Sequence, residues 1–79
     1  MNKSDIFSTI VEHTREVVFE LEDHEFKQDD SLKALGANSI DRSEILMMTL
    51  ESLDIKMPLL ALAKAVNIDE IAGILHARL

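Results

Sequence analysis

The sequence predicts an all-α fold, a four-helix bundle with a long first loop and a short third helix. Apolar residues recur three to four positions apart through most of the chain, which is the spacing of one helix face. No stretch alternates apolar and polar residues with the β-branched and aromatic enrichment of a strand. Only two Gly and one Pro interrupt the pattern. The chain of 79 residues is long enough for one domain, which we assign to residues 1–79.

A first helix is predicted to begin near Ser4 or Asp5, either of which can cap it. Its apolar positions are Ile6, Phe7, Ile10, Val11, Val17, Val18 and Leu21. His13 is expected on the solvated face of this helix. The next segment, residues 20–31, is rich in charge, and Phe26 is its main apolar residue. We predict a surface loop there, of about 15 residues with its continuation, a length that is often functional.

We expect Leu32 and Leu35 to anchor this loop to the core. Gly36 ends the loop, and Asn38 or Ser39 begins a second helix that runs to about residue 53. Pro58 favours the first position of a short third helix over residues 59–66. A fourth helix follows, for which Asn67 is the predicted cap, with apolar positions at Ile68, Ile71, Ala72, Ile74 and Leu75.

The second helix carries apolar residues on two sides. At about 100° per residue, one sector is a core stripe made of Ile45, Leu46, Thr49 and Leu53. The opposite side carries Ile40 and Met47 beside Glu44 and Glu51, with Met48 at its flank. Two interpretations remain open. Ile40 and Met47 either pack under the loop or the third helix, or they form an exposed ridge that binds a partner.

Charge and composition exclude several classes of protein. The formal net charge of −7 argues against binding to nucleic acid or to an anionic membrane surface. No Cys is available for disulfides or thiolate zinc sites. The start of the chain lacks the apolar region of a secretory signal, and the longest apolar run has seven residues, too few to span a bilayer. We therefore expect a cytoplasmic protein, and a monomer.

Catalysis and metal binding are also not expected. His13, His24 and His76 are never three or four positions apart, so no helical metal pair exists. The acidic residues between 22 and 30 lack the spacing and the central Gly of a calcium loop. Ser39 has no general base nearby in sequence. A chain this short is also expected to lack a pocket of several hundred Å³.

The segment from Asp30 to Asp41, DSLKALGANSID, resembles the signature of the acyl and peptidyl carrier protein family, D-S-L-x-x-L-G-x-D-S-L/I/V. The matching residues are Asp30, Ser31, Leu32, Leu35, Gly36, Ser39 and Ile40. Asp41, Glu44, Met47, Asp54 and Pro58 also fall where members often carry them, and Ile68, Ile71 and Leu75 match the last helix. The resemblance covers essentially the whole chain.

This resemblance implies that Ser39 is esterified by 4′-phosphopantetheine, which a phosphopantetheinyl transferase takes from coenzyme A. The thiol of that arm then holds an acyl group as a thioester. A helix N-terminus favours a phosphodiester, and Ile40 is implied as an apolar contact for the transferase. One residue departs from the pattern, because Asn38 stands where most members have Asp. Asn caps a helix about as well, so the difference concerns transferase or metal contacts.

A narrower resemblance covers Gly36 to Glu51, which is similar to the free-standing acetyl-donor carrier proteins of polyketide β-branching cassettes. It implies as partners a 3-hydroxy-3-methylglutaryl-type synthase, which accepts the acetyl group, and an acyl-loading or decarboxylating enzyme. Residues expected to contact partners are Asn38, Ile40, Asp41, Arg42, Glu44, Met47 and Met48. Two alternatives stay open. One is a general fatty-acid, aryl or aminoacyl carrier, and the other is a cofactor-free helical interaction module in which Ser39 only caps a helix.

Overall fold

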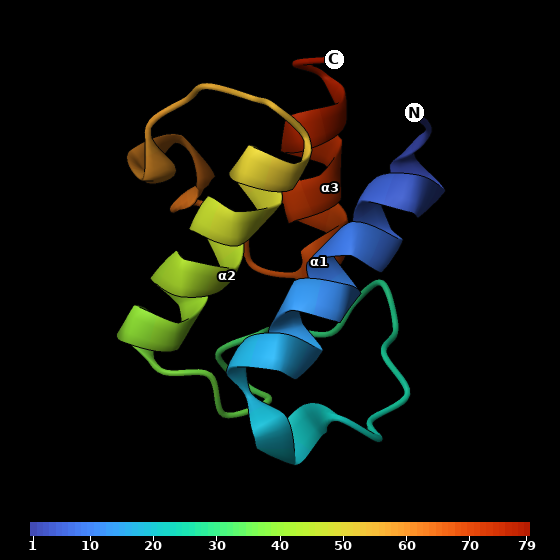
Figure 1. The fold of residues 1–79 in the computed structure, drawn as a ribbon, viewed down its shortest axis with the longest axis vertical. Helices are drawn as coiled ribbons and strands as arrows, with labels where there is room; N and C mark the ends of the chain where they lie inside the picture. Colours follow the sequence, from blue (N-terminus) through green and yellow to red (C-terminus); the bar gives the residue numbers. More distant parts are fainter.

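The computed structural model describes residues 1–79 and contains three α-helices and two short 3-10 helices (Figure 1). In chain order they are α1 (Lys3–Val17), η1 (Phe19–Leu21), α2 (Ser39–Ser52), η2 (Leu59–Leu62) and α3 (Ile68–His76). The long green loop in Figure 1 connects η1 to α2, and α1 packs against both α2 and α3. The prediction of an all-α fold is confirmed. None of the helices combines the length and the apolar character needed to cross a membrane.

Helix α1 begins earlier than the sequence pattern predicted. Asn2 is the N-cap: its side-chain oxygen accepts the N–H of Asp5 at 2.8 Å, and the Asp5 carboxylate accepts the N–H of Asn2 at 3.5 Å. This capping box satisfies two N–H groups at once, so the predicted caps at Ser4 and Asp5 were wrong. The helix ends at Val17, because Val18 is extended, and its predicted continuation is the separate turn η1.

The predicted third helix over residues 59–66 is also shorter in the structure. Only Leu59–Leu62 form a helix, of the 3-10 type, and no side chain caps it. Leu62 is its only buried residue, while Leu60 is 82% exposed, so little apolar burial is available to extend it. The bundle therefore has three α-helices, and a single 3-10 turn occupies the third position.

The core forms where the three α-helices meet. Its fully buried apolar side chains are Ile6 and Ile10 of α1, Ile45 of α2, and Ile68 and Leu75 of α3. Two buried threonines, Thr14 and Thr49, cost little, because each hydroxyl donates to the carbonyl four residues earlier, at 2.7 and 2.8 Å.

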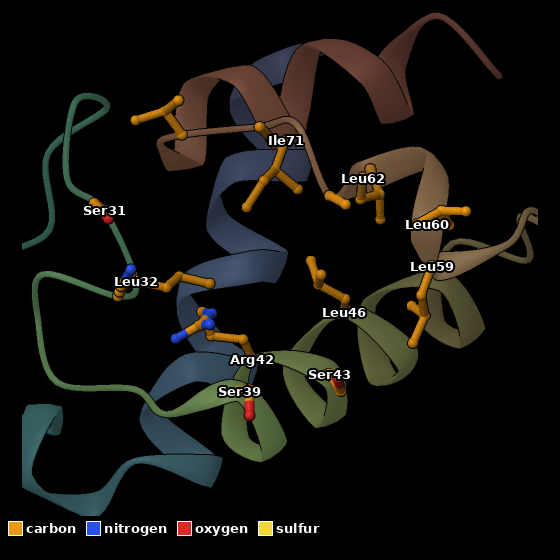
Figure 2. A pocket seen from close by; sticks show the side chains of 14 residues that line it. Ser31, Leu32, Ser39, Arg42, Ser43, Leu46, Leu59, Leu60, Leu62 and Ile71 are labelled. Atoms are coloured by element: carbon orange, nitrogen blue, oxygen red, sulfur yellow. The ribbon is translucent and has the colours of Figure 1, made fainter.

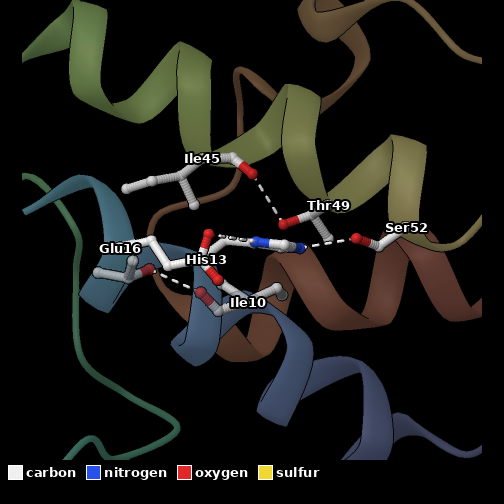
Figure 3. Close-up of polar contacts among 7 residues, drawn as sticks. Ile10, His13, Glu16, Ile45, Thr49 and Ser52 are labelled. Carbon is white, nitrogen blue, oxygen red and sulfur yellow. Dashed lines mark hydrogen bonds and ion pairs between the residues drawn. The ribbon is translucent and has the colours of Figure 1, made fainter.

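A polar contact joins α1 to α2 beside this core (Figure 3). The His13 Nε2 lies 2.7 Å from the Ser52 hydroxyl, and the side chain of His13 is only 15% exposed. His13 Nδ1 lies 3.6 Å from the Glu16 carboxylate and has no hydrogen-bond partner. The expected solvated position of His13 was therefore wrong, because α2 covers this side of α1.

The prediction of two apolar sides on α2 holds, with two corrections to the core side. Ile45, Thr49 and Leu53 are buried as predicted, whereas Leu46 is only partly buried and Leu50 is buried outside the predicted sector. Leu46 faces η2, which is too short to cover it (Figure 2).

On the other side of α2, Ile40 is 75% exposed and Met47 is 57% exposed. Neither residue packs under the loop or against η2. The structure therefore favours the exposed ridge over the alternative in which these residues are covered.

Side chains fold the long loop onto itself. The Asp30 carboxylate accepts the backbone N–H of Lys27 at 2.8 Å and lies 3.0 Å from His24 Nε2. The Lys27 N–H, and then the His24 ring, hold the pKa of Asp30 below its ordinary value of 3.8. The His24 and Phe26 rings pack perpendicular to each other, and the Arg15 guanidinium of α1 lies 5.3 Å from the centre of the Phe26 ring.

The backbone of the loop is tied to α3. The N–H of Ile68 donates to the Asp30 carbonyl, and the N–H of Asp69 donates to the Gln28 carbonyl, both at 2.9 Å. Leu32 is buried, and Leu35 packs partly buried against the core, as the sequence predicted. The loop therefore has a fixed path that ends at the start of α2.

Ile45→Ala should lower the free energy of unfolding by about 2–5 kcal/mol, because Ile45 is fully buried between the helices. Met47→Ala, two positions away and exposed, should change it by less than about 0.5 kcal/mol. Urea denaturation of both variants measures the difference. Similar losses for the two would contradict the two-sided reading of α2.

Asp30→Asn should destabilise the protein at neutral pH, and the effect should disappear in acid. The folded-state pKa of Asp30 is lowered, so its contribution is present above the unfolded value near 3.8 and is lost as the pH falls through the folded value. Urea midpoints of wild type and variant, measured from pH 7 to pH 3, test this. Asp29→Asn is the control, because the exposed Asp29 side chain makes no hydrogen bond. A wild-type advantage that is constant over the whole range would refute the assigned role.

Candidate functional site

Ser39 is the first residue of α2, and its hydroxyl makes no hydrogen bond within the chain. The cap is Asn38, whose side-chain oxygen accepts the N–H of Asp41 at 2.8 Å. The Asp41 carboxylate accepts the N–H of Asn38 in return, at 3.4 Å. Of the two caps left open by the sequence, Asn38 is therefore the one used. This leaves the exposed Ser39 hydroxyl free for other chemistry.

The turn before Ser39 depends on Gly36. Its φ of +105° lies in a region that other residues rarely adopt. The turn is closed by the N–H of Ala37, which donates to the Leu32 carbonyl at 3.0 Å, and the Ala37 side chain is buried. Gly36 and Ala37 thus reverse the chain and fix the point at which α2 begins. As a result, Ser39 is held in a defined position at the surface.

A groove of about 630 Å³ lies beside Ser39, between α2, η2 and the loop (Figure 2). Its wall on α2 consists of Ser39, Arg42, Ser43 and Leu46, and its other walls are mainly apolar, with Leu32, Leu59, Leu60, Leu62, Val66 and Ile71 among them. The expectation that so short a chain lacks a pocket of this size was wrong. One side of the groove is formed by the turn η2, in the place where a full helix was predicted.

Arg42 lies apart from the other residues expected to contact partners. Its Nη1 donates to the Ala37 carbonyl at 2.6 Å, and its side chain lines the groove. No carboxylate lies within 4.0 Å of its guanidinium, since Lys3 with Asp69 is the only lysine or arginine ion pair of the chain. Arg42 therefore does not share the exposed side of α2 that carries Ile40 and Met47, and its contact with a partner stays a prediction.

The remaining predicted residues divide into two groups. Ile40, Glu44 and Met47 are exposed on one side of α2, with Met48 partly buried beside them. We name Ile40, Glu44 and Met47 the α2 ridge. Asn38 and Asp41 form the capping box, so their side chains are already engaged in holding the helix start.

Sequence reasoning missed the groove residues Leu46, Leu59, Leu62 and Ile71 as a site. They come from α2, η2 and α3. Within its own segment, each one has the apolar spacing of an ordinary core residue. The only signal was the apolar run of residues 59–63, which is longer than one 3-10 turn can bury.

These features fit a phosphopantetheine arm. The Ser39 hydroxyl is exposed and unbonded, so it is available for esterification. The groove next to it offers apolar surface to the arm or its cargo. The start of α2 also presents the positive end of the helix dipole to a phosphate.

Comparison with known proteins agrees with this fit. The family model described as the phosphopantetheine attachment site matches residues 10–75. The chain is 42% identical over 76 residues to the polyketide biosynthesis acyl-carrier-protein AcpK of Bacillus subtilis (strain 168), covering 96% of this chain and 93% of that protein.

One similar solved structure is the crystal structure of the HMG synthase of the curacin biosynthetic pathway in complex with an acetyl donor-ACP. It matches with a TM-score of 0.93 and 43% identity, over 98% of this chain and 99% of that one. The chain therefore belongs to the phosphopantetheine-attachment family, as an acyl carrier protein of polyketide biosynthesis that carries its cargo on 4′-phosphopantetheine and is not itself an enzyme.

Proposed function

We propose that Ser39 carries the phosphopantetheine arm and that the protein delivers acetyl from this arm to a 3-hydroxy-3-methylglutaryl-type synthase during polyketide β-branching. The observation that carries the proposal is the free Ser39 hydroxyl at the first position of α2, within a motif whose spacing matches the carrier signature. The acetyl cargo and the synthase are supported by the similarity, over nearly the whole chain, to an acetyl donor solved with such a synthase.

Each part of the site has a defined task in this function. Ser39 Oγ supplies the ester oxygen that links the arm to the protein. Asn38 and Asp41 hold the end of the helix that presents this oxygen. The arm, when attached, supplies a terminal thiol that holds the acetyl group as a thioester. Because an arm on Ser39 starts at the mouth of the groove, its apolar part can fold against the protein between deliveries.

The α2 ridge is the proposed docking surface for the synthase, the phosphopantetheinyl transferase and an acyl-loading or decarboxylating enzyme. Ile40 directly follows Ser39 and Met47 lies eight positions after it, so both expose apolar surface near Ser39, and Glu44 lies between them. Residues 31–58 hold four acidic and three basic residues, so the charge around α2 nearly cancels. A partner is therefore selected more by shape and apolar contact than by a basic patch.

Incubation with coenzyme A and a promiscuous phosphopantetheinyl transferase should add one arm to the wild type, as measured by intact mass. Ser39→Ala should gain no mass. Its stability should change by less than about 0.5 kcal/mol, because the hydroxyl makes no hydrogen bond. Ser43→Ala is the matched control, since Ser43 lies on the same groove wall and should leave the modification intact. A mass gain in a folded Ser39→Ala variant would overturn the attachment site.

Truncation of the α2 ridge should slow acetyl transfer from the loaded protein to the active-site cysteine of a 3-hydroxy-3-methylglutaryl-type synthase. Ile40→Ala and Met47→Ala should each reduce transfer efficiency by about 5- to 30-fold, the range of a buried interface contact of about 1–2 kcal/mol. Leu79→Ala should have no effect, because Leu79 is as exposed as Met47 but lies at the C-terminus, far from the start of α2 (Figure 1).

Equal loading of all variants is confirmed by mass before transfer is compared. If Ile40→Ala and Met47→Ala transfer as fast as wild type, the ridge is not the docking surface. If the wild type transfers no faster than an unrelated fatty-acid carrier, the acetyl-donor proposal fails. In that second case, the protein is a general fatty-acid, aryl or aminoacyl carrier.

A further inference from the structure

We propose that Arg42 binds the phosphodiester of the arm on Ser39 and holds the start of the arm against the mouth of the groove. This inference rests on the proposed attachment at Ser39. It gives Arg42 a role toward the protein's own cofactor, separate from the docking role of the α2 ridge.

The positions of the two residues allow this contact. Arg42 follows Ser39 by three positions in α2, so the two side chains are neighbours one turn apart. Both residues line the same groove (Figure 2). The Ser39 hydroxyl has no hydrogen bond that fixes its direction, so an ester formed on it is free to turn toward Arg42.

The charge of Arg42 is unbalanced in the protein without the arm. No carboxylate lies within 4.0 Å of the guanidinium, and the nearby Asp41 carboxylate faces the Asn38 N–H in the capping box. Arg42 also follows directly after the first turn of α2, where the helix dipole is positive and a cation is unfavourable. A phosphodiester on Ser39 places an anion at this point, which compensates both the arginine and the helix end.

The guanidinium is held in place before the arm is attached. Its bond to the Ala37 carbonyl uses one of five N–H donors and holds the planar group at the groove wall. The other donors remain available, and arginine binds phosphate with two parallel hydrogen bonds more readily than lysine does. Because Arg42 is partly buried, the contact is also less screened by salt than one on an open surface.

The test compares the apo and holo forms of wild type, Arg42→Gln, Arg42→Lys and Arg15→Gln. Urea denaturation should show that attachment of the arm lowers the unfolding equilibrium constant of the wild type about two- to fivefold. Arg42→Gln should abolish this difference between holo and apo forms, and Arg42→Lys should keep part of it. Arg15→Gln, which replaces an arginine at a separate pocket beside α1, should leave it unchanged, although the bond of Arg15 to the His24 carbonyl is lost in both forms.

NMR spectroscopy detects the contact between Arg42 and the phosphodiester directly. The NMR signal of the Arg42 Nε–H group should shift between apo and holo protein at low salt, and the shift should shrink in high salt, while the Arg15 signal stays in place. The inference is wrong if the difference between holo and apo stability survives in Arg42→Gln, or if the Arg42 signal does not move.

A failure of the proposed attachment at Ser39 gives other results than a failure of the Arg42 contact. Intact mass, measured first, reports whether the arm is attached and whether Ser39→Ala prevents it. A holo wild type in which Arg42 makes no contact refutes only the role of Arg42. A wild type that gains no mass, or a Ser39→Ala variant that does, refutes the attachment at Ser39.

Discussion

The burial of Ile45, on the helix α2 that packs on α1, is the interaction on which the rest of the molecule depends. It sets the rotation of α2 about its own axis, because a fully buried residue on one side forces the residues half a turn away toward solvent. Ile40 and Met47 are exposed for this reason. The same rotation turns Arg42 and Leu46 toward the groove. The exposure of the α2 ridge and the direction of the groove-facing residues Arg42 and Leu46 thus both follow from one buried contact, in a domain too small to have a second core.

A second constraint fixes where α2 begins. The loop is bonded through its backbone to the start of α3, and Asp30 closes it internally. Gly36 then reverses the chain, and Asn38 caps the helix with Asp41. None of these contacts uses the hydroxyl of Ser39. The site therefore combines a rigid helix start with a chemically free side chain, and this combination suits a residue that carries a long flexible arm.

The groove illustrates how a small domain gains a binding surface by leaving its packing incomplete. The single turn η2 borders the space beside Leu46 and keeps Leu60 exposed at its edge. This arrangement leaves apolar surface next to Ser39. Departures from complete packing are typical of functional sites.

Sequence by itself determined the helical class, the anchoring of the loop by Leu32, and the motif around Ser39, because periodicity, turn residues and motif spacing are local along the chain. It placed the start of α1 wrongly, since Asn2, Ser4 and Asp5 are all good caps and only the finished bond geometry selects one. The groove was decided by tertiary structure alone. It depends on how far η2 stands from α2, and no local pattern encodes a distance between segments.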